Sequence, residues 1–140
     1  EAPVYIAWSE TNRTPLIRIP AGGEESRIEL RSPDPSANPY LALAVCFAAG
    51  LDGIKQGLMP PKAVNRNVYE MTEEERKIFG IEKLPGSLRE AAIEFQKDTF
   101  IQDVLGDHIA GKYIDAKRKE WHEYRSQVSE WEIQEYLYKY

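Results

Sequence analysis

One stretch of 14 residues, 27–40, constrains the fold of this chain more than any other. It opens with the alternation Arg-Ile-Glu-Leu-Arg. Because successive side chains of a strand point to opposite faces, Arg27, Glu29 and Arg31 share one face, and the two aliphatic residues between them face a core. The alternation therefore predicts a strand with one charged face and one apolar face.

The same stretch ends as the start of a helix. Pro33 and Pro35 stop the strand, since proline cannot donate a hydrogen bond to a sheet. Asn38 and Pro39 then supply a helix N-cap and a proline at the first helical position. Asp34, between the two prolines, is interpreted as a turn residue, with an acid as the alternative.

Two further strands are predicted upstream. Residues 4–8 are aromatic and β-branched, and residues 16–19 form a second apolar run that ends at a proline. A polar turn follows the first strand, and a loop with two glycines, 21–26, follows the second. Short strands joined by short turns predict an antiparallel meander that ends with the strand at 27–31.

The rest of the chain is predicted to be helical. Residues 40–49 are apolar almost all round, which predicts a buried helix with Cys46 packed inside it. Capping boxes and apolar periodicity predict five more helices, beginning after Thr72, after Ser87, at about 99 (to 105), at about 107 (to 128) and after Ser129 (through Tyr138). The aromatic residues near the C-terminus are expected to be docked, on this chain or on another subunit. The predicted fold class is α+β, with short antiparallel strands at the N-terminus and a helical C-terminal region.

Composition limits the function classes. The chain has 140 residues, enough for one domain with a core, and its formal net charge of −5 argues against nucleic acid as the main partner. The longest apolar run is too short to cross a membrane, and no signal peptide is visible. A lone cysteine fits a reducing, cytoplasmic compartment. The chain opens without Met, directly into strand-like sequence, which suggests a piece of something longer.

Few residues carry recognisable chemistry. The sequence has no P-loop and no CxxC, HExxH or GxSxG motif. His108 and His122 share one predicted helix but have no matching carboxylate or cysteine pattern, so surface roles are favoured over metal ligation. The charge run at 115–120 is interpreted as a solvated helix face.

The remaining candidates are four arginines and one glutamate, namely Arg13, Arg18, Arg27, Glu29 and Arg31. Arginine's planar fork suits phosphate and carboxylate groups, and a glutamate offers a hard oxygen ligand to a divalent cation. The set therefore suits an acidic substrate, a polyphosphate and a divalent cation together. A solvated ladder of ion pairs is the alternative interpretation.

Two motifs that contain this set resemble a known family. Residues 12–20 read NRxxxxRxP, and residues 27–40 read RxExRxPDPxANPY. With EAPVY at the start and AGLDGI at 49–54, they resemble the C-terminal part of the catalytic domain of a type I (bacterial) glutamine synthetase. The resemblance extends over essentially the whole chain.

The resemblance implies an activity and a role for each candidate. The activity is ATP-dependent ligation of ammonia to glutamate through a γ-glutamyl phosphate intermediate, with Mg²⁺ or Mn²⁺. Arg13 resembles the arginine that stabilises the transferring phosphoryl group, in contact with nucleotide and glutamate. Arg18 and Arg27 resemble arginines that hold nucleotide phosphates. Glu29 resembles a ligand of the metal that serves ATP, and Arg31 resembles the arginine that grips the carboxylate of glutamate.

The resemblance also implies an organisation. Residues 1–140 would form the C-terminal portion of a catalytic domain, with 1–35 as the strand part of the active site and 36–140 as the helical part. The strands would belong to a larger sheet, and the intact protein would be a homo-oligomer, a dodecamer of two hexameric rings, open to regulator binding. The family's β-grasp domain and further metal-binding residues lie upstream of this region, so the isolated chain is expected to be inactive.

Some alternatives stay open. The loop at 21–26 lacks an arginine that many relatives carry and is about one residue shorter than theirs. Tyr69 resembles the tyrosine that is adenylylated in one branch of the family, although the chain looks closer to the branch controlled by feedback and regulators; its alternative role is to anchor an irregular loop. A γ-glutamyl ligase for polyamines and a non-catalytic structural or regulatory relative are the competing functions.

Overall fold

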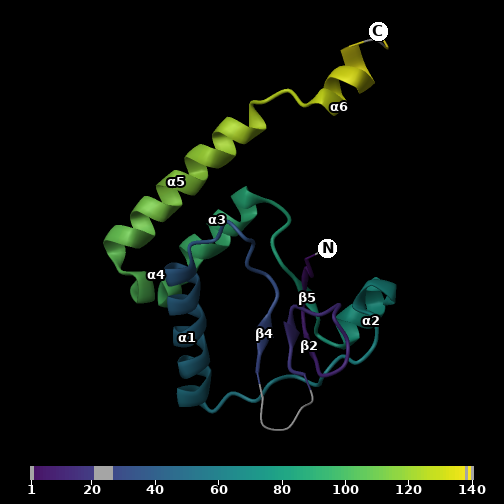
Figure 1. The fold of residues 1–140 in the computed structure, drawn as a ribbon, viewed down its shortest axis with the longest axis vertical. Coiled ribbons are helices and arrows are strands. Elements are labelled where there is room, and N and C mark those ends of the chain that lie inside the picture. The colour runs from purple at the N-terminus through teal and green to yellow at the C-terminus, as the bar shows by residue number, and fades with distance from the viewer. Residues whose placement is uncertain (1, 21–26, 138, 140) are drawn as a thin grey trace. The chain divides into compact units, whose positions relative to one another are not determined.

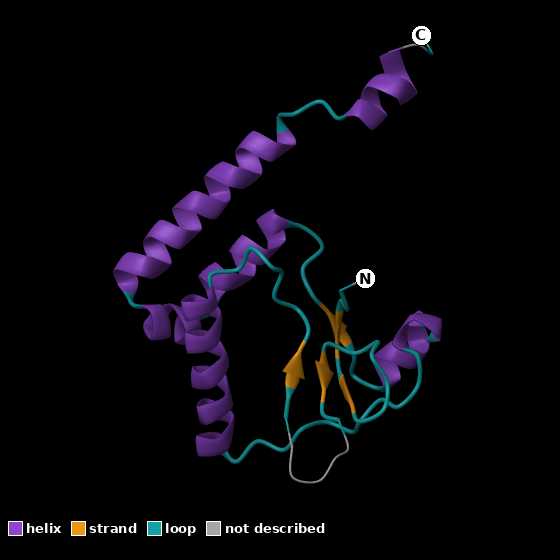
Figure 2. Cartoon of the chain, in the orientation of Figure 1, coloured by secondary structure: helices purple, strands orange, loops and turns teal. Residues whose placement is uncertain are grey.

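We describe a computed structural model of the chain, which defines residues 2–20, 27–137 and 139. This part of the chain forms two compact units, unit 1 ending at Leu84 and unit 2 beginning at Pro85. Figure 1 follows the chain through both units. The described strands all belong to unit 1, and the regular elements described in unit 2 are helices (Figure 2).

Unit 1 contains two small sheets built from two-residue strands. β1 (Tyr5–Ile6) pairs antiparallel with β5 (Glu82–Lys83). The second sheet has the order β2-β3-β4, made of β2 (Trp8–Ser9), β3 (Ile17–Arg18) and β4 (Glu29–Leu30). β3 and β4 are antiparallel. Short strands followed by helices confirm the predicted α+β class.

The predicted meander is wrong in its first half. The strand expected at 4–8 is interrupted at Ala7, whose main-chain N–H donates to the carbonyl of Tyr5 at 3.0 Å, so β1 and β2 join different sheets. β2 and β3 run parallel, with Trp8 opposite Ile17. The segment between β2 and β3 does not form a hairpin turn. Instead, the side chain of Asn12 in this segment bonds to the main chain of Val64 and Arg66. β5 escaped prediction because Glu and Lys have low strand propensity.

The long helix of unit 1 begins where the sequence predicted. α1 (Pro39–Gln56) starts after Asn38, whose side-chain oxygen accepts hydrogen bonds from the main-chain N–H groups of Tyr40 and Leu41 at 3.0 and 3.3 Å. It ends at Gly57, which adopts the left-handed conformation (φ 64°) that glycine tolerates best.

The expected burial of this helix is wrong. No residue of α1 is buried, Phe47 is 69% exposed, and Cys46 is exposed as well. An apolar helix is buried only where a second apolar surface covers it. Along one side of α1, Ile28 and Leu30 of the β4 segment share a groove with it.

The core of unit 1 lies under β1. Ala7, Val64, Val68 and Met71 are buried together, and Tyr5 and Ile81 pack against them. The segment that supplies this core includes a short 3₁₀ turn, η1 (Val68–Glu70), followed by α2 (Glu73–Ile78). α2 has the complete capping box predicted at Thr72, with reciprocal bonds to Glu75.

Unit 2 consists of α3 (Leu88–Lys97), α4 (Thr99–Leu105), α5 (Asp107–Arg125), α6 (Glu130–Glu132) and the π-helical turn η2 (Ile133–Leu137). α3, α4 and α5 pack on one another around Ala92, Ala110 and Ile114, and the rings of Phe95 and Tyr113 meet edge to face at 5.7 Å. The helix predicted at 99–105 is confirmed, and the one predicted to 128 ends at Arg125.

The three predicted capping boxes have different outcomes. Those at Thr72 and Ser129 are complete. At Ser87 only one half forms, because the carboxylate of Glu90 accepts from the main-chain N–H of Gly86 at 2.8 Å. His108 and His122 are both exposed on α5.

The C-terminal segment is exposed where it is described, with Trp131 at 63% and Tyr136 at 56%. Its predicted docking therefore has no partner surface within the described part of this chain. The predictions on the loop at 21–26, Tyr138 and Tyr140 lie outside the described residues. None of the described helices combines the length and apolar character needed to cross a membrane.

Candidate functional site

The centre of the candidate site is an ion pair across two neighbouring strands. Arg18 of β3 and Glu29 of β4 are register partners in the antiparallel ladder. Nη1 of Arg18 lies 3.2 Å from Oε1 and 3.0 Å from Oε2 of Glu29, so one guanidinium nitrogen contacts both carboxylate oxygens. The side chains are 19% and 29% exposed, which places the pair on a partly covered face of the sheet.

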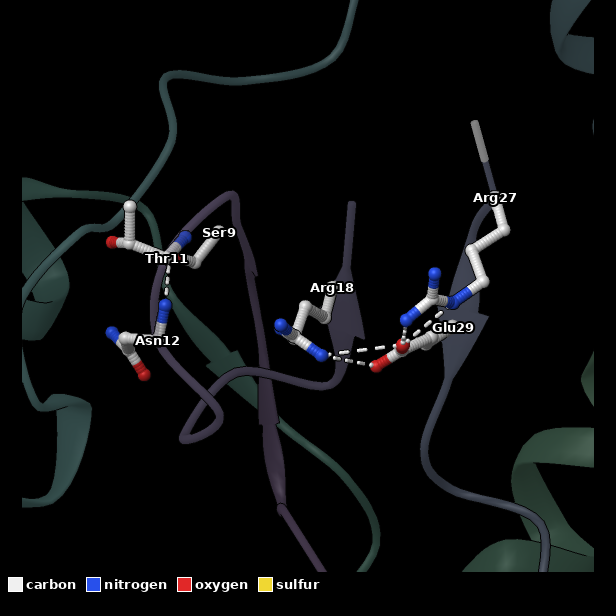
Figure 3. A network of polar contacts seen from close by, with 6 residues as sticks. All are labelled: Ser9, Thr11, Asn12, Arg18, Arg27 and Glu29. Atoms are coloured by element: carbon white, nitrogen blue, oxygen red, sulfur yellow. Dashed lines mark hydrogen bonds and ion pairs between the residues drawn. The ribbon is translucent and has the colours of Figure 1, made fainter. Parts of the chain in front are cut away.

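A second arginine reaches the same carboxylate from the other side (Figure 3). Arg27, two residues before Glu29 on one strand face, places Nε 3.0 Å and Nη2 2.9 Å from Oε1. The hydrogen bond from Arg18, followed by that from Arg27, lowers the pKa of Glu29 despite the opposing effect of desolvation. The carboxylate is therefore held in its charged form between two cations.

Arg18 of β3 and Arg31, the residue after β4, each retain an unpaired guanidinium nitrogen within the described part of the chain. Nε of Arg18 and Nη1 of Arg31 are buried and have no hydrogen-bond partner among the described residues. Arg31 is fixed at its main chain, where its N–H donates to the carbonyl of Leu16 at 2.9 Å. Buried donors without partners are uncommon, and at a charged face they indicate where an anion can bind.

Arg13 lies apart from this cluster. It is exposed on the turn between β2 and β3, and no ion pair is described for it. The structure therefore brings Arg18, Arg27 and Glu29 into contact. It places Arg31 in the same segment, and Arg13 has no ion pair with any residue that the structure describes.

The turn that carries Arg13 is fixed by its neighbours. Asn12 uses its whole amide: Nδ2 donates to the carbonyls of Val64 at 3.2 Å and Arg66 at 2.7 Å, and Oδ1 accepts from the N–H and hydroxyl of Thr14 at 2.6 and 2.7 Å. The hydroxyl of Thr14 in turn accepts from the N–H of Val68 at 3.1 Å. These bonds tie the turn to the loop at 64–68.

A buried serine completes the same network. Ser9 has no exposed surface; its hydroxyl donates to Oδ1 of Asn65 at 2.8 Å and accepts from the N–H groups of Thr11 and Asn12 at 3.2 and 3.1 Å. Figure 3 shows Ser9, Thr11 and Asn12 next to the ion-pair cluster. The sequence predicted a polar turn here that carries Arg13, without the hydrogen bonds of Ser9 and Asn12. The signal that this prediction missed is Asn-x-Thr, a spacing at which an Asn side chain commonly bonds its own backbone.

Other candidates have structural roles in the described part of the chain. The carboxylate of Asp34 accepts from the main-chain N–H of Ser36 at 2.7 Å, which supports the turn interpretation. Tyr69 is 46% exposed, and its ring meets that of Tyr5 edge to face at 5.2 Å. Tyr69 therefore anchors η1 to β1, as the anchoring alternative predicted.

Glu29 is the one predicted metal ligand. Its carboxylate is the hard donor that Mg²⁺ and Mn²⁺ prefer. No group of three or more His, Cys, Asp and Glu side chains comes together as a metal site within the described residues. Among the described residues, Glu29 therefore fits a divalent cation as one ligand only, and a site there would need further ligands.

Comparison with known proteins gives one consistent result. The family model for the glutamine synthetase catalytic domain matches residues 1–136. Glutamine synthetases of Thermotoga maritima, Clostridium saccharobutylicum and Thermus thermophilus are 55%, 52% and 52% identical over 99%, 100% and 100% of this chain. The chain spans about a third (32%) of the length of these relatives.

Proposed function

The chain belongs to the glutamine synthetase family, and we propose that it is the C-terminal portion of the catalytic domain of a longer enzyme that joins ammonia to glutamate. The reaction consumes ATP and passes through a γ-glutamyl phosphate. Within it, residues 1–35 form the strand part of the active site, and residues 36–140 form the helical part.

The observation that carries this proposal is the cluster at β3 and β4. Arg18 and Arg27 converge on Glu29, and two buried guanidinium nitrogens, on Arg18 and Arg31, point to further anionic partners. Phosphoryl transfer is catalysed mainly by positioning and by neutralising charge on the phosphoryl oxygens. The guanidinium groups of Arg18, Arg27 and Arg31 would supply the positive charge that this neutralisation needs.

Each side chain has a distinct part in the proposal. Arg18 and Arg27 hold the nucleotide phosphates, and Arg31 binds the carboxylate of glutamate with the donor that is unpaired among the described residues. Arg13, held on its fixed turn, stabilises the phosphoryl group in transit between nucleotide and glutamate.

Glu29 would hold the divalent cation, Mg²⁺ or Mn²⁺, as one of several ligands. When bound, the cation neutralises charge on the nucleotide phosphates. The other ligands would come from the nucleotide, from water and from residues of the longer protein, because the described residues assemble no cluster of their own.

We also infer a homo-oligomer, with the exposed aromatic side chains of Trp131 and Tyr136 at subunit contacts. A dodecamer of two hexameric rings is the assembly that the family resemblance implies. A reducing, cytoplasmic location is inferred from the exposed lone cysteine, Cys46.

The longer protein that contains this chain tests the proposal. Purified with Mg²⁺, it should form glutamine and ADP from glutamate, ammonia and ATP. Replacing ammonia with a polyamine should give far slower turnover. Faster turnover with the polyamine would make it a γ-glutamyl-polyamine ligase, and no turnover with either acceptor would favour a non-catalytic relative.

A further inference from the structure

Arg18 and Arg27 are proposed to bind phosphate, and Glu29 is proposed to bind the cation. In this structure the three side chains are paired with one another. Glu29 offers two carboxylate oxygens, and both lie within 3.2 Å of Nη1 of Arg18. Oε1 is also contacted by Nε and Nη2 of Arg27, at 3.0 and 2.9 Å. A phosphate that takes the guanidinium nitrogens now bonded to Glu29 must therefore replace the carboxylate, whereas Nε of Arg18 is unpaired among the described residues.

We propose that Glu29 is an internal competitor of phosphate for Arg18 and Arg27, so that polyphosphate and a divalent cation bind this cluster cooperatively. The proposal rests on the function proposed above and adds how occupation of the site is controlled. Without the cation, the ion pairs compete with polyphosphate for the two arginines and weaken its binding.

The cooperativity follows from the free energy of the Glu29 carboxylate after polyphosphate has displaced it. A polyphosphate that captures both arginines leaves Glu29 partly covered and without its cationic partners, which is unfavourable for a charged group. A divalent cation removes that cost by pairing with the carboxylate. By linkage, each ligand then strengthens the binding of the other by the same factor.

One of the two ion pairs, Arg18 with Glu29, is partly covered, whereas the side chain of Arg27 is 56% exposed. The side chains of Arg18 and Glu29 are 19% and 29% exposed, whereas those of Lys77 and Glu73, a pair on the surface of α2, are 77% and 75% exposed. Solvent screens the Arg18–Glu29 ion pair less than the Lys77–Glu73 pair, so breaking it costs more free energy.

Inorganic tripolyphosphate, titrated calorimetrically into the 140-residue chain in metal-free buffer, tests the proposal. Glu29→Gln should bind tripolyphosphate several-fold more tightly than the wild type. Glu29→Asp keeps the charge but is too short to engage both arginines fully, so it should show part of that gain. Glu75→Gln, which removes another arginine-paired carboxylate from unit 1, is the matched control and should bind as the wild type does.

A second measurement needs no substitution. With the wild-type chain saturated by tripolyphosphate, the NMR signal of the Nε–H of Arg27 should shift, because its carboxylate partner has been displaced. Adding Mg²⁺ should tighten tripolyphosphate binding in the wild type much more than in Glu29→Gln.

Each contrary outcome has one meaning. Equal affinities for wild type and Glu29→Gln would overturn the competition while leaving the phosphate assignment intact. A gain in Glu29→Gln with none in Glu29→Asp would replace the competition by a simple effect of net charge, and an unmoved Arg27 signal at saturation would also overturn it. Binding by no variant, with or without Mg²⁺, would reject both the competition and the assignment of Arg18 and Arg27 to phosphate.

Discussion

The two faces of the segment around β3 and β4 differ in how far this chain completes them. On one face, the charged groups of Arg18, Arg27 and Glu29 are paired with one another at hydrogen-bonding distances. On the other, Leu30 is 39% exposed and the neighbouring Ile28 is 71% exposed. Both of these residues line a groove along α1 with Leu43, Phe47 and Leu51.

The difference shows that contacts within unit 1 complete the charged face but not the apolar face. Ion pairs and hydrogen bonds within unit 1 fix the charged face, so its geometry can be interpreted in terms of ligands. The apolar face exposes large side chains in one patch, and patches of this kind mark surfaces that another element or chain covers. We therefore expect substitutions on the charged face to change catalysis, and substitutions on the apolar face to change assembly.

The largest effect is expected at Arg31, on the charged face. In the longer protein, Arg31→Ala should raise the Michaelis constant for glutamate far more than that for ATP, because a charged hydrogen-bonding partner of the carboxylate is lost. Such a loss typically costs about 2–5 kcal/mol. Initial-rate kinetics with each substrate varied in turn measure the two constants, and equal damage to both would reject the assignment of Arg31 to glutamate.

A smaller effect is expected at the turn that supports the charged face. Asn12→Ala should lower the free energy of unfolding of the chain by about 2 kcal/mol, since it leaves main-chain groups of the 64–68 loop without partners. Urea unfolding monitored by circular dichroism measures this. Asn12→Asp keeps the acceptor for Thr14 but loses both donors, so it should also destabilise.

The neighbouring Thr11 supplies the control for the turn. Its main-chain N–H, and not its side chain, joins the described network, so Thr11→Ala should unfold at the wild-type urea concentration. If Asn12→Ala also did so, the network would have no role in holding Arg13 in place.

On the apolar face, the expected effect is on assembly and leaves the fold intact. The isolated chain should self-associate through this patch, and Phe47→Asp should weaken the association because it places a charge in the apolar groove. Ala49→Asp puts the same charge on α1 at an exposed position that does not line the groove, and is the control. Size-exclusion chromatography with light scattering decides; a wild-type chain that stays monomeric would contradict the expectation.

The smallest effect is a dependence of stability on pH at α2. The hydrogen bond from the main chain of Thr72, and then that from Arg66, lower the pKa of Glu75 below its ordinary value of 4.5. A carboxylate with a lowered pKa in the folded state adds stability that is complete above the ordinary pKa. That stability is lost as the pH falls from 4.5 through the lower, folded-state pKa.

The variant Glu75→Gln isolates the contribution of the Glu75 charge to stability. The difference in unfolding free energy between the wild type and Glu75→Gln should be constant near neutral pH and shrink below about pH 4.5. Urea titrations at several pH values measure it. A difference that stays constant down to pH 3 would show that Glu75 does not contribute through its charge.

How far the sequence predicts the molecule depends on whether local rules suffice. The cap at Asn38 and the helix at 99–105 follow from residues close in the chain, and the structure agrees with them. The strand predicted at 27–31 is shorter, Glu29–Leu30, and its predicted core face is wrong, because Ile28 and Leu30 are 71% and 39% exposed. The pairing of β1 with β5 and the parallel register of β2 and β3 depend on distant segments. Periodicity carries no information about such partners.

The candidate site shows the same division. The alternation of charged and apolar residues predicted its charged residues, and two motifs gave their roles. The contact of Glu29 with Arg18 follows from strand register, and that with Arg27 from a spacing of two residues. The network around Asn12 and Ser9 was missed because its partners at 64–68 lie more than 50 positions away in the chain. The burial expected for α1 failed because an apolar sequence does not reveal what covers it.

The central claim is that the charged face takes part in phosphoryl transfer from ATP to glutamate. Isotope exchange tests this claim most directly. ATP labelled in its β,γ-bridging oxygen is incubated with the longer protein, Mg²⁺ and glutamate, without ammonia. Reversible transfer to glutamate should scramble the label, whereas omission of glutamate, or the substitution Glu29→Gln, should abolish scrambling. Scrambling that persists unchanged in Glu29→Gln, or that never appears in the wild type while glutamine is still formed, would contradict the account.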